Sequence, residues 1–254
     1  MPSKVNQSSQ RILRGKFLEL IASNIEKYGW HVYVVQQGNC PRYIYTIGLT
    51  KKIGFEIIMA GCSIYQLDHA VGLVNDFAKM AIENAGNLQS NVELDGKEYG
   101  IGLCHESWSN RLMLGYLDYY GSSSVSALQM CPPPSDWTLD TPDLTAPWDS
   151  VSQPVWQWLE LPWSLPVPTS ATVATSISVL RGRKVTEISR WSTDEWEMFS
   201  DLDADLSEDN MRVIPFGTAY ASDNTIKPAI LLHIKSGIYR NDAESPWKSW
   251  RKEE

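Results

Sequence analysis

Hydrophobic and polar positions follow helical spacing in two stretches of this 254-residue chain. Apolar residues recur every three or four positions from Ser9 to Tyr28 and again from Tyr65 to Asn84, the spacing of one face of an α-helix. Gly29 follows the first stretch directly and suits the left-handed residue that often ends a helix. We therefore predict two amphipathic helices, one over each stretch.

Short segments rich in β-branched and aromatic residues follow each predicted helix. Asp95-Gly96 is a strong signal for a two-residue hairpin turn, because both central positions of that turn favour a positive φ. We therefore expect paired antiparallel strands on either side of it. The predicted strands of the first half of the chain are 30–35, 43–47, 55–60, 91–94, 97–103 and 125–130.

The pattern is weaker in the last third of the chain. Ser176–Leu180 and Val185–Arg190 are predicted as strands around Gly182, and the Thr193 region is predicted to open a short helix. Further elements are expected at 211–216 and 229–234. This order of elements predicts an α+β protein with antiparallel or mixed sheets and flanking helices.

Three segments are expected along the chain. Residues 9–150 form a first α+β domain, residues 151–171 a connecting segment rich in Pro and Trp, and residues 172–254 a smaller α+β domain.

The stretch before residue 171 has an unusual composition. There is no Lys or Arg between Arg111 and Arg181, and nine prolines lie between Pro132 and Pro168. Proline excludes a long helix or a central strand, whereas the many tryptophans argue against a flexible linker. Two interpretations stay open. The tryptophans pack on the first domain, or Trp156 and Trp158 are exposed and contact a partner.

Composition limits the partners and the compartment. The net charge of −8 argues against a nucleic-acid partner and is compatible with a basic protein. No apolar run approaches the roughly 20 residues that cross a bilayer, and the N-terminal residues lack a secretory core, so we expect a cytoplasmic protein without a membrane partner. The four cysteines form no Cys-x-x-Cys pair and are expected as buried free thiols: Cys40, Cys62, Cys104 and Cys131.

Scattered polar residues leave an enzyme open as an alternative. His31, Glu56 and His105 could form a general acid/base or metal site if the fold brings them together, since such sites combine distant residues. Tyr45 and Thr46 could line a pocket with Glu56 and His105, and alternation places one of the two toward the core. No phosphate loop, nucleophile elbow or dinucleotide fingerprint is present, and no metal or cofactor is predicted.

Several short motifs in the first domain occur in a specific order. The first motif is Tyr45-Thr46-Ile47-Gly48-Leu49. Its glycine, Gly48, is expected to permit a strand end or a close backbone approach. The other motifs are Gly29-Trp30, Glu56, Tyr119-Tyr120-Gly121, Gln129 and Pro147-Trp148. With these motifs, residues 15–150 resemble the bacterial domain of unknown function family 4262. Phe55 replaces a usual proline, and the 132–144 stretch is longer than in the family. The resemblance implies an α+β fold and no agreed activity.

The last 65 residues or so carry a second, fainter set of motifs. They comprise Arg190, the pair Trp196 and Phe199, an acidic run, Asp223 with Ile226, and Arg240 before Trp247. This part is similar to small immunity-protein-like domains of bacterial toxin systems. Such domains occlude a toxin and need no chemistry of their own.

An acidic run lies within this second unit. It contains eight acids and no cation, and Leu206 stands where a calcium loop of the EF-hand type needs glycine. Complementary charge would favour a partner with a basic cleft, and the alternative is a solvated surface loop. The acids are Asp194, Glu195, Glu197, Asp201, Asp203, Asp205, Glu208 and Asp209.

The leading hypothesis is a non-catalytic protein-binding module, an immunity protein that neutralises a cognate toxin or effector protein by direct contact. The alternatives are a hydrolase-type or metal-dependent enzyme that uses His31, Glu56 or His105, and a small-ligand sensor.

Overall fold

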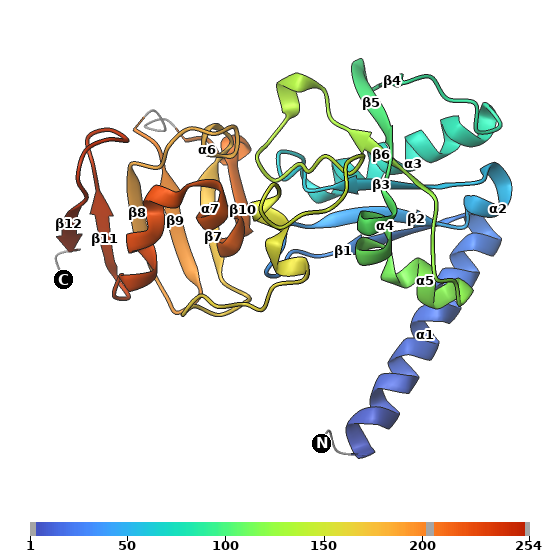
Figure 1. Cartoon of the computed structure of the whole chain (residues 1–254), viewed down its shortest axis with the longest axis horizontal. Helices are drawn as coiled ribbons and strands as arrows, with labels where there is room; N and C mark the ends of the chain where they lie inside the picture. The colour runs from blue at the N-terminus through green and yellow to red at the C-terminus, as the bar shows by residue number, and fades with distance from the viewer. Residues whose placement is uncertain (1–3, 202–205, 252–254) are drawn as a thin grey trace.

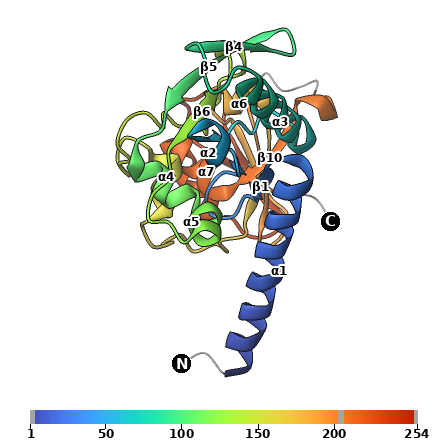
Figure 2. The ribbon, with the colours of Figure 1, turned by 90° about the vertical axis from the view of Figure 1, so that its right-hand side faces the viewer.

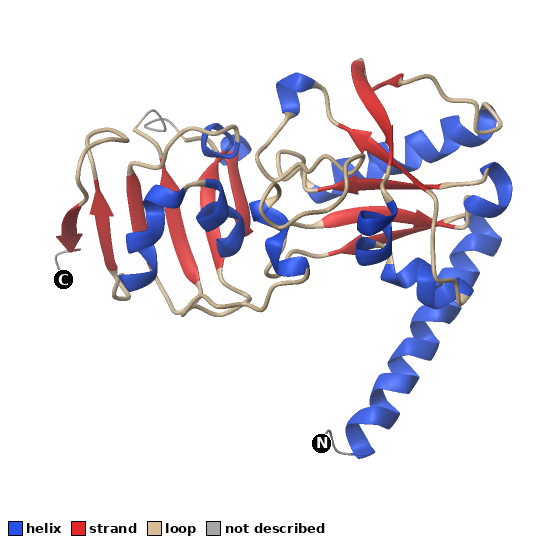
Figure 3. Ribbon diagram, in the orientation of Figure 1, coloured by secondary structure: helices blue, strands red, loops and turns tan. Residues whose placement is uncertain are grey.

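The protein is built from two sheets that lie next to each other, and the Pro- and Trp-rich segment passes between them (Figure 1). The computed structural model describes residues 4–201 and 206–251. Both sheets of this described part are six-stranded and mixed, with helices packed on them, so the predicted α+β class is confirmed. Figure 3 shows how the helices and strands are distributed between the two units.

The first unit contains most of the predicted elements. Its strands occur in the order β1-β2-β3-β6-β5-β4, in which only β3 and β6 are parallel. Its elements are α1 (Lys4–Tyr28), β1 (His31–Val35), β2 (Tyr43–Ile47), α2 (Thr50–Ile53), β3 (Glu56–Ala60), α3 (Leu67–Glu83), β4 (Asn91–Leu94), β5 (Lys97–Leu103), α4 (Glu106–Leu112), α5 (Leu114–Tyr120) and β6 (Ala127–Cys131). The two predicted helices and six predicted strands are confirmed, with ends that move by up to five residues.

The second sheet has the order β10-β7-β9-β8-β11-β12, in which only β7 and β9 are parallel. The remaining elements are η1 (Pro134–Asp136), η2 (Pro154–Leu159), β7 (Thr172–Ser176), α6 (Ile177–Leu180), β8 (Glu187–Arg190), β9 (Glu195–Phe199), η3 (Glu208–Asn210), β10 (Met211–Pro215), α7 (Phe216–Ser222), η4 (Asn224–Leu231), β11 (Ser236–Tyr239) and β12 (Lys248–Arg251).

Two predictions for the second unit were wrong. The predicted strand Ser176–Leu180 is the short helix α6, because the Ser176 hydroxyl accepts a hydrogen bond from the Val179 amide and caps the helix after β7 ends. The helix predicted near Thr193 is instead strand β9, which is paired on both sides. Its alternate residues point into the core, and that tertiary pairing overrides the local helix signal.

Both faces of the first sheet are covered. Helix α3 packs Val74 and Phe77 against one face, where Ile57 and Met59 are buried. Trp108 and other aromatic side chains fill the opposite face. The first unit therefore has a layer on each side of its sheet.

The prolines and tryptophans of residues 132–171 form an irregular layer on this second face and reach the other unit. Trp156 is 1% exposed and Trp158 is 7% exposed, and both belong to the core of the first unit. Gly217 of α7 lies so close to Trp158 that an added Cβ would approach the ring to 2.7 Å. The suggestion that Trp156 and Trp158 are exposed partner contacts is therefore corrected: both serve as packing groups.

Helix α1 extends beyond the body of the protein, as the turned view shows (Figure 2). Within the helix, Ile21 is buried, whereas Ile12, Leu13 and Leu20 are exposed. Gly29 ends the helix with a φ of +93°, as predicted, and its amide donates to the Ile25 carbonyl. Among the described residues, no helix combines the length and apolar content that spanning a membrane requires.

Candidate functional site

Glu56, the glutamate of the first family resemblance, is fully buried at the start of β3. Its carboxylate accepts hydrogen bonds from the hydroxyls of Thr46 (2.7 Å) and Thr50 (2.9 Å). It also accepts from the backbone amides of Gly48 (2.9 Å), Leu49 (3.2 Å) and Thr50 (2.9 Å). Burial raises the pKa of Glu56, and these hydrogen bonds oppose that rise. The carboxylate thus ties β3 to the loop between β2 and α2.

The motif Tyr45–Leu49 supplies the backbone that this carboxylate needs. Gly48 has a φ of +123°, and a Cβ there would lie 3.2 Å from the Trp30 Cα and 3.3 Å from the Gly29 carbonyl oxygen. The predicted close backbone approach at Gly48 is confirmed. Because only glycine fits, the chain can turn its amides onto Glu56, and the motif serves the fold.

Tyr45 and Thr46 are both buried, so the expectation that only one of them faces the core was wrong. The reason is that β2 is covered on both faces. Tyr45 stacks on Tyr33 with ring centroids 5.0 Å apart, and its hydroxyl accepts from the Gly115 amide at 2.9 Å. The Thr46 hydroxyl donates to Glu56 and accepts from the Ile57 amide at 2.9 Å.

The histidines of the enzyme alternative have partners of their own. His31 is buried beside Asn24, whose amide nitrogen lies 2.8 Å from its Nδ1, and burial lowers the pKa of His31. His105 caps α4, where its Nδ1 accepts from the Ser107 amide at 3.2 Å. In the described part of the chain, no hydrogen bond or ion pair joins His31, Glu56 and His105 to one another, so the structure does not assemble them into one hydrogen-bonded constellation.

Other residues that could support chemistry are also placed for structure. Within residues 4–201 and 206–251, no group of three or more His, Cys, Asp or Glu side chains could hold a metal ion. The four cysteines are free thiols, as predicted; three are buried and Cys131 is partly buried. Burial raises the pKa of Cys40 to about 12 and that of Cys131 to about 11, so these thiols stay protonated at neutral pH.

The predicted acidic run is divided between a turn, a strand and a surface loop. Asp194 lies in the exposed turn before β9, and Glu195 and Glu197 are in β9 itself. Asp201, Glu208 and Asp209 are exposed after the strand. Asp203 and Asp205 lie outside the described residues. The run is therefore only partly a strand of the second sheet, and of its acids Glu195 and Glu197 lie within β9.

The strand alternation separates the second sheet into two faces. Trp196 and Met198 are buried in a core that α7 and η4 complete, and Figure 1 shows these helices over the sheet. Glu195, Glu197 and Phe199 alternate with them and lie on the opposite side, which we call the outer face. The pair of Trp196 and Phe199 from the second resemblance is thus divided between the two faces.

The outer face combines acids with exposed apolar and aromatic residues. Across the strands, Phe199 pairs with Glu187, and Glu187 pairs with Tyr239. In the next row, Glu197 pairs with Ala174, and Ala174 pairs with Val213. Directly paired residues share a face, so these side chains form one surface. Val213 is 56% exposed and Tyr239 is 41% exposed.

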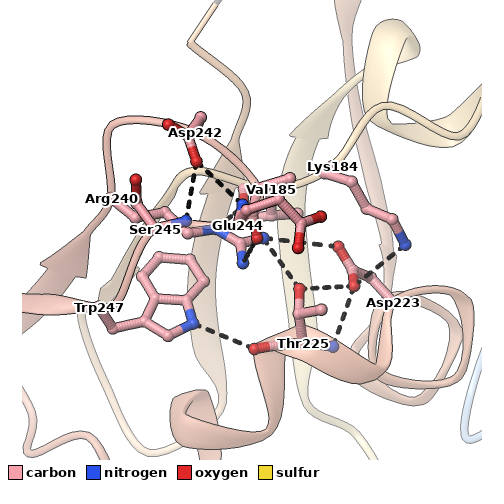
Figure 4. A network of polar contacts seen from close by, with 10 residues as sticks. Lys184, Val185, Asp223, Thr225, Arg240, Asp242, Glu244, Ser245 and Trp247 are labelled. Carbon is pink, nitrogen blue, oxygen red and sulfur yellow. Dashed lines mark hydrogen bonds and ion pairs between the residues drawn. The ribbon is translucent and has the colours of Figure 1, made fainter.

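The late arginine and tryptophan of the second resemblance hold the C-terminal segment in place (Figure 4). The buried guanidinium of Arg240 donates to the Val185 carbonyl and to the Thr225 hydroxyl at 2.9 Å. It also stacks on Trp247 at 4.3 Å and lies 4.0 Å from the Asp223 carboxylate. The carbonyl and carboxylate oxygens satisfy this buried cation, so the network is structural.

Sequence reasoning missed Thr50, which gives Glu56 both its amide and its hydroxyl. Thr50 is the first residue of α2, one position after the N-cap Leu49, so the usual capping preference for Thr does not single it out. The exposed Val213 and Tyr239 were also missed. They become noticeable only when the strands are paired.

The first unit is thus a mixed six-stranded sheet whose signature glutamate fixes the loop between β2 and α2. Residues 24–137 match the family model described as Domain of unknown function (DUF4262). This match covers all six strands of the first sheet and supports the resemblance for that unit. Comparisons with curated proteins and with solved structures gave no match.

Proposed function

We propose that this chain is a binding protein that contacts a basic protein partner through the outer face of its second sheet. The observation that supports the proposal is the coincidence on one face of Glu187, Glu195 and Glu197 with Phe199, Tyr239 and Val213. The acids select a partner surface of positive charge and help to orient it, whereas exposed aromatic and apolar groups supply contact area.

A rigid scaffold favours recognition by this face. Apart from Val213 on the edge strand β10, its residues lie on the inner strands β8, β9 and β11, and the inner side chains of the sheet are packed against α7 and η4. The surface is therefore pre-organised, and binding requires little ordering. Together with the resemblance of this unit to immunity-protein-like domains, this suggests that the partner is a bacterial toxin whose basic cleft the outer face occludes.

Charge reversal tests the proposal directly. The full chain is co-expressed with the protein encoded beside it, and complex formation and relief of toxicity are measured at several salt concentrations. We expect a complex that weakens as the salt concentration rises. The double variant Glu195→Lys with Glu197→Lys should abolish this complex.

A matched control makes the same charge change elsewhere. Glu93 and Glu98 are exposed acids of the hairpin β4–β5 in the first unit, so Glu93→Lys with Glu98→Lys alters the net charge equally. This control should bind as the unchanged protein does. Equal losses in both double variants, or no complex and no relief of toxicity at moderate salt, would refute the proposal.

A further inference from the structure

The junction of the two units contains a cavity of about 310 Å³. Arg42, Ser63 and Gln66 line it from the first unit, and Arg212 lines it from β10 of the second unit. The volume is near the lower end of the range for small-molecule sites. A ligand in this cavity would contact both units at once.

The charge of this junction cavity is opposite to that of the whole protein. The chain has a net charge of −8, yet among the described residues the cavity lining includes two arginines and no Asp or Glu. Burial is the main cause that lowers the pKa of Arg42; the charge of Asp140 opposes it, and the positive charge of Arg212 adds a smaller lowering. The two guanidiniums repel each other weakly, so an anionic ligand between them would relieve an unfavourable interaction.

Arg42 has unused hydrogen-bonding capacity. Among the described residues, it donates one hydrogen bond, to the Tyr65 carbonyl, and no carboxylate lies within ion-pair distance. Asp140 is the nearest acid that acts on it, but Asp140 accepts hydrogen bonds from Ser63 (2.6 Å) and Thr138 (2.6 Å). A guanidinium has five N–H donors, so four of those of Arg42 are left for a ligand.

Arg240 shows how this fold satisfies an arginine that needs no ligand. It donates to the Val185 and Ala243 carbonyls and the Thr225 hydroxyl, and it has Asp223 at 4.0 Å (Figure 4). Arg42 has no comparable set of acceptors. The contrast distinguishes a structural guanidinium from one that faces an accessible cavity.

Arg212 and helix α3 approach the same cavity in fixed positions. The guanidinium of Arg212 is held by hydrogen bonds to the carbonyls of Ile64 (2.6 and 2.8 Å), Asp209 (2.8 Å) and Met211 (2.6 Å), so it contributes a fixed positive charge and few free donors. Helix α3 begins at Leu67 beside the cavity, and the Gln66 side chain makes no capping hydrogen bond there. Free amides at a helix N-terminus favour an anion, although exposed Asp68 in the first turn moderates that effect.

We propose that this junction cavity binds the phosphate group of a small molecule. Two guanidiniums from different units and the start of α3 surround it from several directions, which suits a tetrahedral dianion better than a planar carboxylate. The cavity borders the outer face at Ala174 and Val213, but the proposal does not rest on the proposed partner.

Titration of the full chain tests the site. Inorganic phosphate, adenosine monophosphate and citrate are added separately at constant ionic strength, and binding is followed by calorimetry and by thermal unfolding. Phosphate or adenosine monophosphate should bind saturably and raise the melting temperature more than equal ionic strength of chloride. Binding of citrate alone would overturn the assignment to phosphate.

Variants then locate the binding. Arg42→Gln should weaken phosphate binding by at least about tenfold, because it removes charge-assisted hydrogen bonds. Arg183→Gln is the control, since Arg183 is exposed in the second unit and lies outside this lining. Phosphorus NMR line widths provide a second readout, with circular dichroism as the check on folding. Absence of saturable binding in the folded protein, or equal affinity in Arg42→Gln and the unchanged chain, would refute the site.

Discussion

Replacing Glu56 by Gln should destabilise the first unit far more than its small change in shape suggests. Oε1 accepts three hydrogen bonds, from the Gly48 amide and from both donors of Thr50. Oε2 accepts two, from the Thr46 hydroxyl and the Leu49 amide. Glutamine has only one acceptor oxygen. In its better orientation it keeps the three bonds and directs an NH₂ group at the Leu49 amide.

The cost can be estimated from these contacts. One buried amide loses its acceptor, at about 1–3 kcal/mol, and the bonds that remain lose the assistance of the charge, at about 1 kcal/mol together. We therefore expect Glu56→Gln to lower the free energy of unfolding by about 2–4 kcal/mol, a large fraction of the usual 5–15 kcal/mol.

Urea unfolding followed by tryptophan fluorescence measures this loss, and hydrogen exchange of the 46–57 segment localises it. The amides of Gly48, Leu49 and Thr50 should lose protection first. Glu93→Gln is the control, because Glu93 is exposed on β4. A loss below about 0.5 kcal/mol in Glu56→Gln, equal to that of an ordinary surface change, would refute the role assigned to this carboxylate.

Three further predictions concern stability. Burial alone would raise the pKa of Asp136, but hydrogen bonds, chiefly from Lys97, leave it lowered. Its stabilisation is complete above the unfolded value of about 3.9 and is lost as pH falls through the lowered folded value, so Asp136→Asn should cost about 1–3 kcal/mol at pH 7 and progressively less as the pH is lowered below about 4 in urea titrations. Gly61→Ala should lower the free energy of unfolding by about 2–5 kcal/mol in calorimetry, since φ is +68° and a Cβ would overlap a backbone carbonyl. Gly54→Ala is the control: φ there is +89° and the space is open, so the loss should be only about 1 kcal/mol. Equal losses of stability in the two variants would contradict this reasoning. Burial lowers the pKa of His31, so the unchanged protein should lose stability as pH falls below about 6.5, and His31→Gln should show a smaller slope of melting temperature between pH 7 and 5.

Local signals were sufficient for most elements of the first unit. The turn at Asp95-Gly96 and the apolar spacing of α3 depend on neighbours in the chain, and the structure confirms both. Local signals failed at β9, where Thr193 and the acids after it indicated a helix. There, pairing with β7 and β8 decided the outcome, and that pairing brings together residues from 172 to 199.

The candidate sites show the same division. The sequence by itself identified Glu56, Gly48 and the acids of β9 as unusual, because residue type and order are visible in one dimension. Only the tertiary structure decided that Glu56 is held in a buried hydrogen-bond network. It also decided that Arg42 and Arg212, 170 positions apart, line one cavity. Burial and proximity depend on how distant segments pack, so no local pattern could reveal them.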